Sequence, residues 1–96
     1  MHRVLLERRI RDVHARLVRA RQELAVLDEQ LAVVRESADE ARVRALVSET
    51  PLATQEHDEA ERHADVMARA RAALCQTVAD LERRQDELLS DVGTSR

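Results

Sequence analysis

The chain has 96 residues, of which 36% are charged, with one Gly, one Pro and no Phe, Tyr or Trp. Ala, Arg, Glu, Leu and Val dominate this composition, which favours long helices and argues against a sheet or an aromatic-filled globular core. The net charge of −3 gives the whole molecule no electrostatic reason to bind nucleic acid or an anionic membrane directly.

The first predicted helix covers about residues 2–47. Its apolar residues recur at an unbroken alternation of four and three positions, which is the pattern of a coiled-coil seam. The residues of this seam are Leu6, Ile10, Val13, Leu17, Ala20, Leu24, Leu27, Leu31, Val34, Ala38, Ala41 and Ala45.

A turn is predicted at about residues 48–50. Thr50 has the chemistry of an N-cap, and Pro51 suits the first helical position, where its missing N–H has no partner to lose. The alternative is one continuous helix kinked at the proline, at a cost of about 3 kcal/mol. Continuing the first seam past Ala45 would bury mostly polar residues, so the sequence favours a hairpin.

The second predicted helix covers about residues 51–92, with Gly93 as its C′ residue and a frayed tail at residues 93–96. The same alternation returns here, and only three seam positions are polar. The residues of this seam are Ala53, His57, Ala60, Ala64, Met67, Arg71, Leu74, Val78, Leu81, Gln85, Leu88 and Val92. We therefore predict an all-α fold, a single antiparallel two-helix coiled-coil hairpin over residues 1–96.

Folding back about Glu49 pairs the two seams so that partner numbers sum to 98. Arg71 then lies opposite Leu27 and needs a carboxylate such as Glu23 or Asp28, while Gln85 lies opposite Val13. We expect these polar seam residues to fix the register or the oligomeric state. Flanking charges largely agree with this alignment; His14, for example, would face Glu82, whereas Arg16 opposite Arg84 is the one like-charge pair.

Outward apolar residues gather at the same height in both predicted helices. They predict a homodimer in which two hairpins form an antiparallel four-helix bundle. The alternative is that Ala serves only as the best helix former on a solvated face. The candidate self-association residues are Val18, Ala25, Val26, Ala32, Val33, Val66, Ala68, Ala70, Ala72, Ala73, Cys75 and Ala79.

The sequence offers little chemistry for catalysis. The residues from His57 to His63 include two His–Glu pairs four apart, but a charged, solvated first turn explains them better than a metal site. Glycine-rich phosphate loops, nucleophile elbows and Cys-x-x-Cys motifs do not occur. We expect a protein that is not an enzyme, with no cofactor and no bound metal.

One segment resembles a known family. Residues 52–61 are similar to the start of the second helix in the N-terminal coiled-coil hairpin of bacterial Gre transcript-cleavage factors, with Glu56 matching a family glutamate and His57 replacing the family tyrosine that follows it. The resemblance implies a hairpin that enters the secondary channel of RNA polymerase, where acidic tip residues help to hold a catalytic magnesium ion. The candidate tip residues are Glu49, Glu56, Asp58 and Glu59.

Three functions follow as expectations. The first is a protein–protein interaction or scaffold protein that self-associates through its apolar mid-section and binds an unknown protein partner. The second is a transcription regulator that places an acidic tip in the polymerase channel. The third is a structural spacer that binds no ligand. We expect a cytoplasmic location, because the single Cys75 cannot form an intramolecular disulfide and the apolar runs are too short for a signal peptide or a membrane span.

Overall fold

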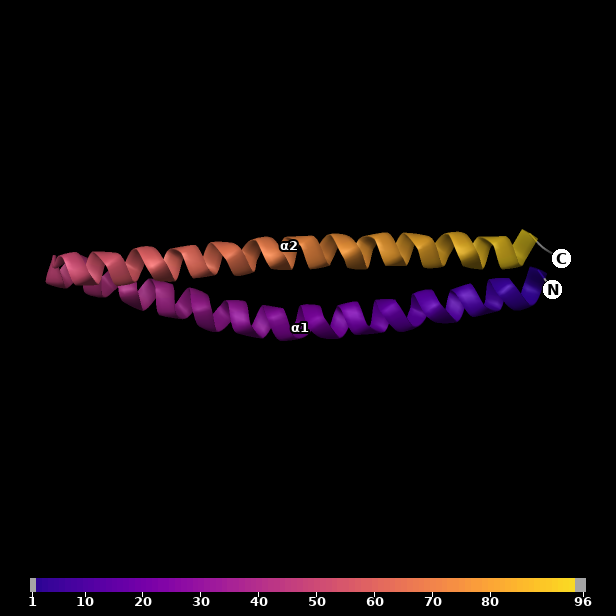
Figure 1. The fold of residues 1–96 in the computed structure, drawn as a ribbon, viewed down its shortest axis with the longest axis horizontal. Helices are drawn as coiled ribbons and strands as arrows, with labels where there is room; N and C mark the ends of the chain where they lie inside the picture. The colour runs from indigo at the N-terminus through magenta and orange to yellow at the C-terminus, as the bar shows by residue number, and fades with distance from the viewer. Residues whose placement is uncertain (1, 95–96) are drawn as a thin grey trace. The chain divides into compact units, whose positions relative to one another are not determined.

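The computed structural model describes residues 2–94 and contains two helices, α1 (His2–Ser48) and α2 (Pro51–Thr94). Over these residues the chain is helical except at Glu49 and Thr50, and it forms no strand. The two helices run in opposite directions along each other, as the colours in Figure 1 show. The predicted all-α helical hairpin is confirmed.

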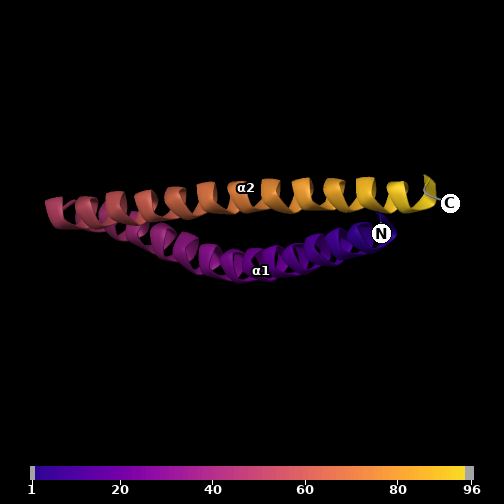
Figure 2. The same ribbon diagram turned by 45° about the vertical axis from the view of Figure 1, so that its right-hand side comes forward.

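The helix pair divides into two compact units. Unit 1 is formed by the described residues of Met1–Leu24 and Ala73–Arg96, and unit 2 by Ala25–Ala72. Each unit contains one segment of α1 beside one segment of α2, as both ribbon views show (Figures 1 and 2). Unit 1 holds the start of α1 and the end of α2, and unit 2 holds the turn.

The predicted seam is the buried surface of both helices. All twelve seam positions of α1 and all twelve of α2 are buried or half-buried. Among the other described residues, only Ala68 and Cys75 leave the exposed class. The alternation of four and three therefore identifies the packed face correctly. In a coiled coil, right-handed helices wind around each other in a left-handed supercoil, which keeps one such stripe of each helix in contact with its partner.

The seam also defines the two outer sides of each unit. In heptad notation, Ile10 and Val78 occupy a positions and Leu6 and Leu81 occupy d positions. Antiparallel helices bring e positions beside e positions and g positions beside g positions. We call the surface of b and e positions the e side, and the surface of c and g positions the g side.

Polar contacts join the helices on the e side. In unit 1, Gln85 Nε2 lies 3.3 Å from His14 Nδ1, and Arg21 Nη2 lies 3.8 Å from Glu82 Oε2. The sequence predicted that His14 faces Glu82, but the longer Arg21 side chain reaches this carboxylate, and His14 lies beside Gln85 instead.

Unit 2 has an equivalent contact on its e side. Arg71 donates a hydrogen bond from Nε to Asp28 Oδ1 and forms an ion pair with it. Asp28 is one of the two carboxylates that the sequence suggested as partners of Arg71. The guanidinium is therefore half-buried in the seam, and Asp28 compensates its charge. This ion pair favours the observed register of the two helices over shifted registers, in which Arg71 would lose this partner.

The turn needs only two residues. Glu49 adopts a left-handed backbone with φ of 50°, and its N–H donates to the carbonyl of Ala45 at 3.1 Å, which closes α1. The hydroxyl oxygen of Thr50 accepts the N–H of Ala53 at 3.1 Å. Thr50 is therefore the N-cap of α2 and Pro51 its first residue, as predicted.

The predicted end of the second helix is wrong by two residues. Gly93 lies inside α2, which continues to Thr94, and its φ is not positive, so it does not act as a C′ residue. Instead the hydroxyl of Thr94 donates to the carbonyl of Asp91 at 3.1 Å, satisfying an acceptor of the last turn. The rest of the predicted frayed tail, residues 95–96, lies outside the described residues.

Glu49→Gly should stabilise the hairpin by about 0.5–1 kcal/mol, because glycine adopts the left-handed conformation without the cost that Cβ imposes. The melting temperature, followed by circular dichroism, should rise by a few degrees. Glu49→Ala removes the same carboxylate but keeps Cβ, and it should leave the melting temperature near that of the native chain. Equal melting temperatures for the two variants would contradict this explanation of the turn.

Candidate functional site

The core of unit 2 is thin. Its buried residues are Leu31 and four alanines, Ala38, Ala41, Ala53 and Ala64. Unit 1 instead buries six large aliphatic side chains and one alanine in one cluster that both helices contribute to. Alanine buries little area, so the helices of unit 2 gain less hydrophobic stabilisation from each other than those of unit 1 do.

Unit 2 leaves large apolar side chains exposed on its g side. Val26, Val33 and Val66 all occupy c positions and are 54%, 63% and 62% exposed. Val33 also lines a groove of about 600 Å³ whose apolar lining continues with Val34 and Met67. Polar groups border this groove, namely Glu29, Gln30 and His63.

Unit 1 carries a groove of different chemistry on its g side. This groove has a volume of about 410 Å³ and an apolar floor made by Ala20, Leu74 and Leu81. Arg16, Arg19, Glu23 and Thr77 line it as well. Within residues 2–94, neither Arg16 nor Arg19 forms an ion pair.

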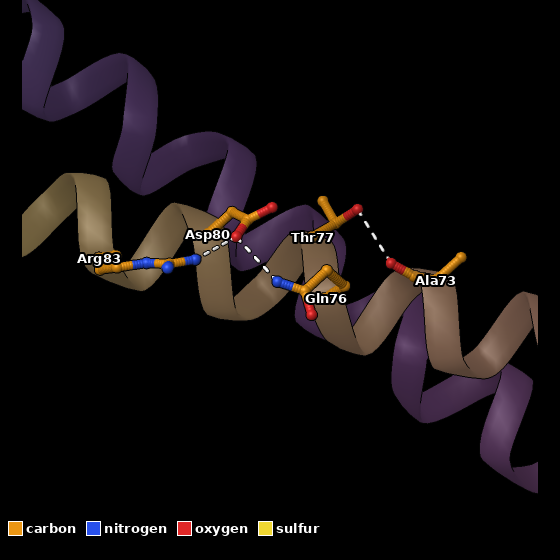
Figure 3. Close-up of polar contacts among 5 residues, drawn as sticks. All are labelled: Ala73, Gln76, Thr77, Asp80 and Arg83. Carbon is orange, nitrogen blue, oxygen red and sulfur yellow. Dashed lines mark hydrogen bonds and ion pairs between the residues drawn. The ribbon is translucent and has the colours of Figure 1, made fainter.

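The polar groups of α2 beside this groove are bonded within their own helix. The Thr77 hydroxyl donates to the carbonyl of Ala73 at 3.2 Å, as Figure 3 shows. Asp80 accepts hydrogen bonds from Gln76, at 3.0 Å, and from Arg83 (Figure 3). Because Arg83 compensates Asp80, the charged groups left at the groove of unit 1 are Arg16, Arg19 and Glu23 of α1, with a net charge of +1.

The predicted self-association residues fall on both sides of the helix pair. The g side carries Val26, Val33, Val66 and Ala70 in unit 2, and Ala73 in unit 1. The e side carries Ala25, Ala32, Ala68 and Ala72 in unit 2, and Val18, Cys75 and Ala79 in unit 1. Among these candidates, the large exposed valines of unit 2 lie on the g side, and all of its alanines except Ala70 lie on the e side beside the Arg71–Asp28 ion pair. Near the turn, the e side also presents Leu46, which is 69% exposed.

The predicted acidic tip residues surround the turn of unit 2. Glu49, Glu56, Asp58 and Glu59 are all exposed, and Glu59 accepts a hydrogen bond from Gln55 at 3.4 Å. Sequence reasoning missed the apolar side chains among them. Leu46, Val47 and Leu52 are 69%, 79% and 64% exposed, and Val43 is also exposed on the same stretch of α1.

The histidines near the start of α2 have local partners. His57 Nε2 lies 3.3 Å from Glu61 Oε1, one turn away on the same helix. In the part of the chain that the structure describes, no three side chains of His, Cys, Asp or Glu converge as metal ligands would. Cys75 is free and half-buried next to the seam of unit 1.

Across residues 2–94, neither helix has a stretch that is both long and apolar enough to cross a membrane.

Comparisons with protein-family models, with curated proteins and with solved structures each give no match.

The g side was recognisable in the sequence through its spacing. Val26 and Val33 stand seven residues apart, and Val47 follows at three times that interval from Val26, so all three share one heptad position. The grooves could not be recognised in this way, because their shape depends on how the side chains of both helices pack against each other.

Proposed function

We propose that this protein is a non-enzymatic helical hairpin that self-associates through the g side of unit 2 and serves as a protein–protein interaction or scaffold module. The observation that carries the proposal is the imbalance within unit 2, where one leucine and four alanines are buried while five valines stay more than half exposed. Four of these valines lie on the g side, namely Val26, Val33, Val47 and Val66. Small helical domains need additional apolar burial for stability. A second copy on the g side supplies it.

The geometry of the g side suits such a contact. Val33 borders the groove whose lining includes Val34 and Met67, so an apolar side chain from a partner can enter between the helices. Glu29, Gln30 and His63 border the same groove and form a polar rim. An apolar centre with a polar rim is the common arrangement of protein interfaces. Four helices packed in this way form the antiparallel bundle that the sequence predicts.

A double substitution on the g side tests this proposal. We expect the native chain to have twice the mass of one chain by light scattering at micromolar concentration, and Val26→Asp with Val66→Asp to have the mass of a single chain. Each carboxylate should weaken association by at least about tenfold, since burying an unpaired polar group costs about 1–3 kcal/mol.

Ala25→Asp with Ala72→Asp is the matched control. These two residues are exposed in the same unit but belong to the e side, so this variant should keep the native mass. Far-UV circular dichroism should show unchanged helix content for both variants. A native chain that is monomeric at micromolar concentration, or a valine variant with the native mass, would contradict self-association through the g side.

A second candidate function rests on the tip. Exposed acidic residues and exposed Leu46, Val47 and Leu52 lie together around the turn, and such a mixture of apolar and acidic groups is suited to a partner with a basic, partly apolar cavity. We propose, as this alternative, a regulator that inserts the tip into the secondary channel of RNA polymerase. The similarity of residues 52–61 to Gre-type hairpins supports the choice of partner.

The tip proposal predicts that the native hairpin retains polymerase subunits from a lysate of its own organism. A variant with Glu49, Glu56, Asp58 and Glu59 changed to Ala should lose them, because the contact depends on tip charge. The control variant removes the same charge elsewhere, with Asp12, Asp65, Asp86 and Asp91 changed to Ala, and should retain them. Failure to retain polymerase, or equal retention by all three proteins, would reject the tip as the determinant.

A further inference from the structure

The two grooves of the g side have complementary chemistry. The groove of unit 1 carries Arg16 and Arg19 over an apolar floor, and neither arginine has an ion-pair partner within residues 2–94. The groove of unit 2 carries Glu29 beside Val33 and Met67, and Glu29 likewise lacks an ion pair among the described residues. The arginines of the unit 1 groove and the carboxylate of the unit 2 groove can therefore serve as ion-pair partners for each other.

We propose that the unit 1 groove is the docking site for the g side of unit 2 from a second copy of this chain. In this contact Arg16 and Arg19 bind Glu29 of the second copy, while Glu23 lies near its His63. This inference rests on the proposed self-association and adds which surfaces meet. Arginine suits such a contact because its planar guanidinium can bind a carboxylate through two parallel hydrogen bonds.

The charges of the whole units support the same pairing. The segments of unit 1 contain ten Arg and eight acidic residues, a net charge of +2, whereas unit 2 contains six Arg and eleven acidic residues, a net charge of −5. Contact between two copies of unit 2 would bring two strongly acidic surfaces together, which costs free energy. Contact between unit 1 and unit 2 of different copies brings opposite charges together and speeds their encounter.

The apolar surfaces of the two grooves match as well. The floor of the unit 1 groove consists of Ala20, Leu74 and Leu81, and the small side chain of Ala20 leaves room above it. Val33 of unit 2 is 63% exposed and has the size to fill such a space. Burying this valine against the leucines removes apolar area from water in both copies, which adds to the attraction between the charges.

Every copy carries both surfaces, so the contact is self-complementary. When unit 1 of the first copy binds unit 2 of the second, the second copy still offers its own unit 1 to the first. A dimer in which both contacts form is two-fold symmetric, because each copy then uses the same two surfaces. This is the antiparallel arrangement that opposite charges in the two units favour.

Charge reversal tests the pairing of the grooves. Arg16→Glu with Arg19→Glu, and separately Glu29→Arg, should each weaken the homodimer by at least about tenfold in sedimentation equilibrium, because like charges then face each other. An equimolar mixture of the two variants should recover native affinity as a heterodimer, detected by native mass spectrometry with one chain labelled with ¹⁵N. In that heterodimer both contacts again join opposite charges.

The matched control is Arg8→Glu with Arg11→Glu, which reverses two exposed arginines of unit 1 that have the same spacing but lie outside the groove. It should leave the dimer intact. Native affinity in the groove variants, or a mixture that stays monomeric, would overturn the pairing while leaving self-association through the valines in place. A native chain that is monomeric would instead overturn the proposed function itself, and the pairing with it.

Discussion

The whole structure depends on burying one narrow aliphatic stripe along each helix. A helix this long and this highly charged gains its stability from tertiary packing more than from propensity, so the alternation of four and three apolar positions must stay in contact throughout. That requirement sets the antiparallel hairpin and leaves the other described side chains exposed, except those of Ala68 and Cys75. The size of the seam residues therefore matters: leucines and valines dominate the buried cluster of unit 1, whereas the buried residues of unit 2 are mostly alanines, which bury little area.

The two outer sides of the helix pair take different roles because of this seam. On the e side, Gln85 and Glu82 of unit 1 and Arg71 of unit 2 make polar contacts to the opposite helix. On the g side, each unit has a groove instead. The side that carries the cross-helix contacts favours the register. In the proposed dimer, contact on the g side would add apolar burial to the thin core of unit 2 and would leave the contacts that align the helices in place.

The sequence predicted the fold almost completely, and the site only in part. Seam, turn and N-cap follow from local rules that need no knowledge of tertiary contacts, so Leu17, Thr50 and Pro51 were placed correctly. The end of α2 was not, because Gly93 stays helical when Thr94 satisfies a terminal carbonyl. The sequence pattern alone treated the outward alanines and valines as one set. Their positions around the packed helices show that Ala32 lies on the e side and Val33 on the g side. The sequence does not show which arginines remain without an ion-pair partner, because this depends on which side chain is long enough to reach a given carboxylate. Arg21, for example, pairs with Glu82, which was expected to face His14.

The most direct test of the account compares the chemical accessibility of two neighbouring positions in unit 2. In a Cys75→Ser background, Val33→Cys places a thiol on the g side and Ala32→Cys places one on the e side, and both native residues are exposed in the single chain. Rates of maleimide labelling should be measured from nanomolar to high micromolar protein concentration. The account predicts that labelling at position 33 slows by about tenfold or more as the dimer forms, while position 32 keeps its rate. Equal rates at all concentrations, or protection of position 32 alone, would show that the g side is not where this protein meets its partner.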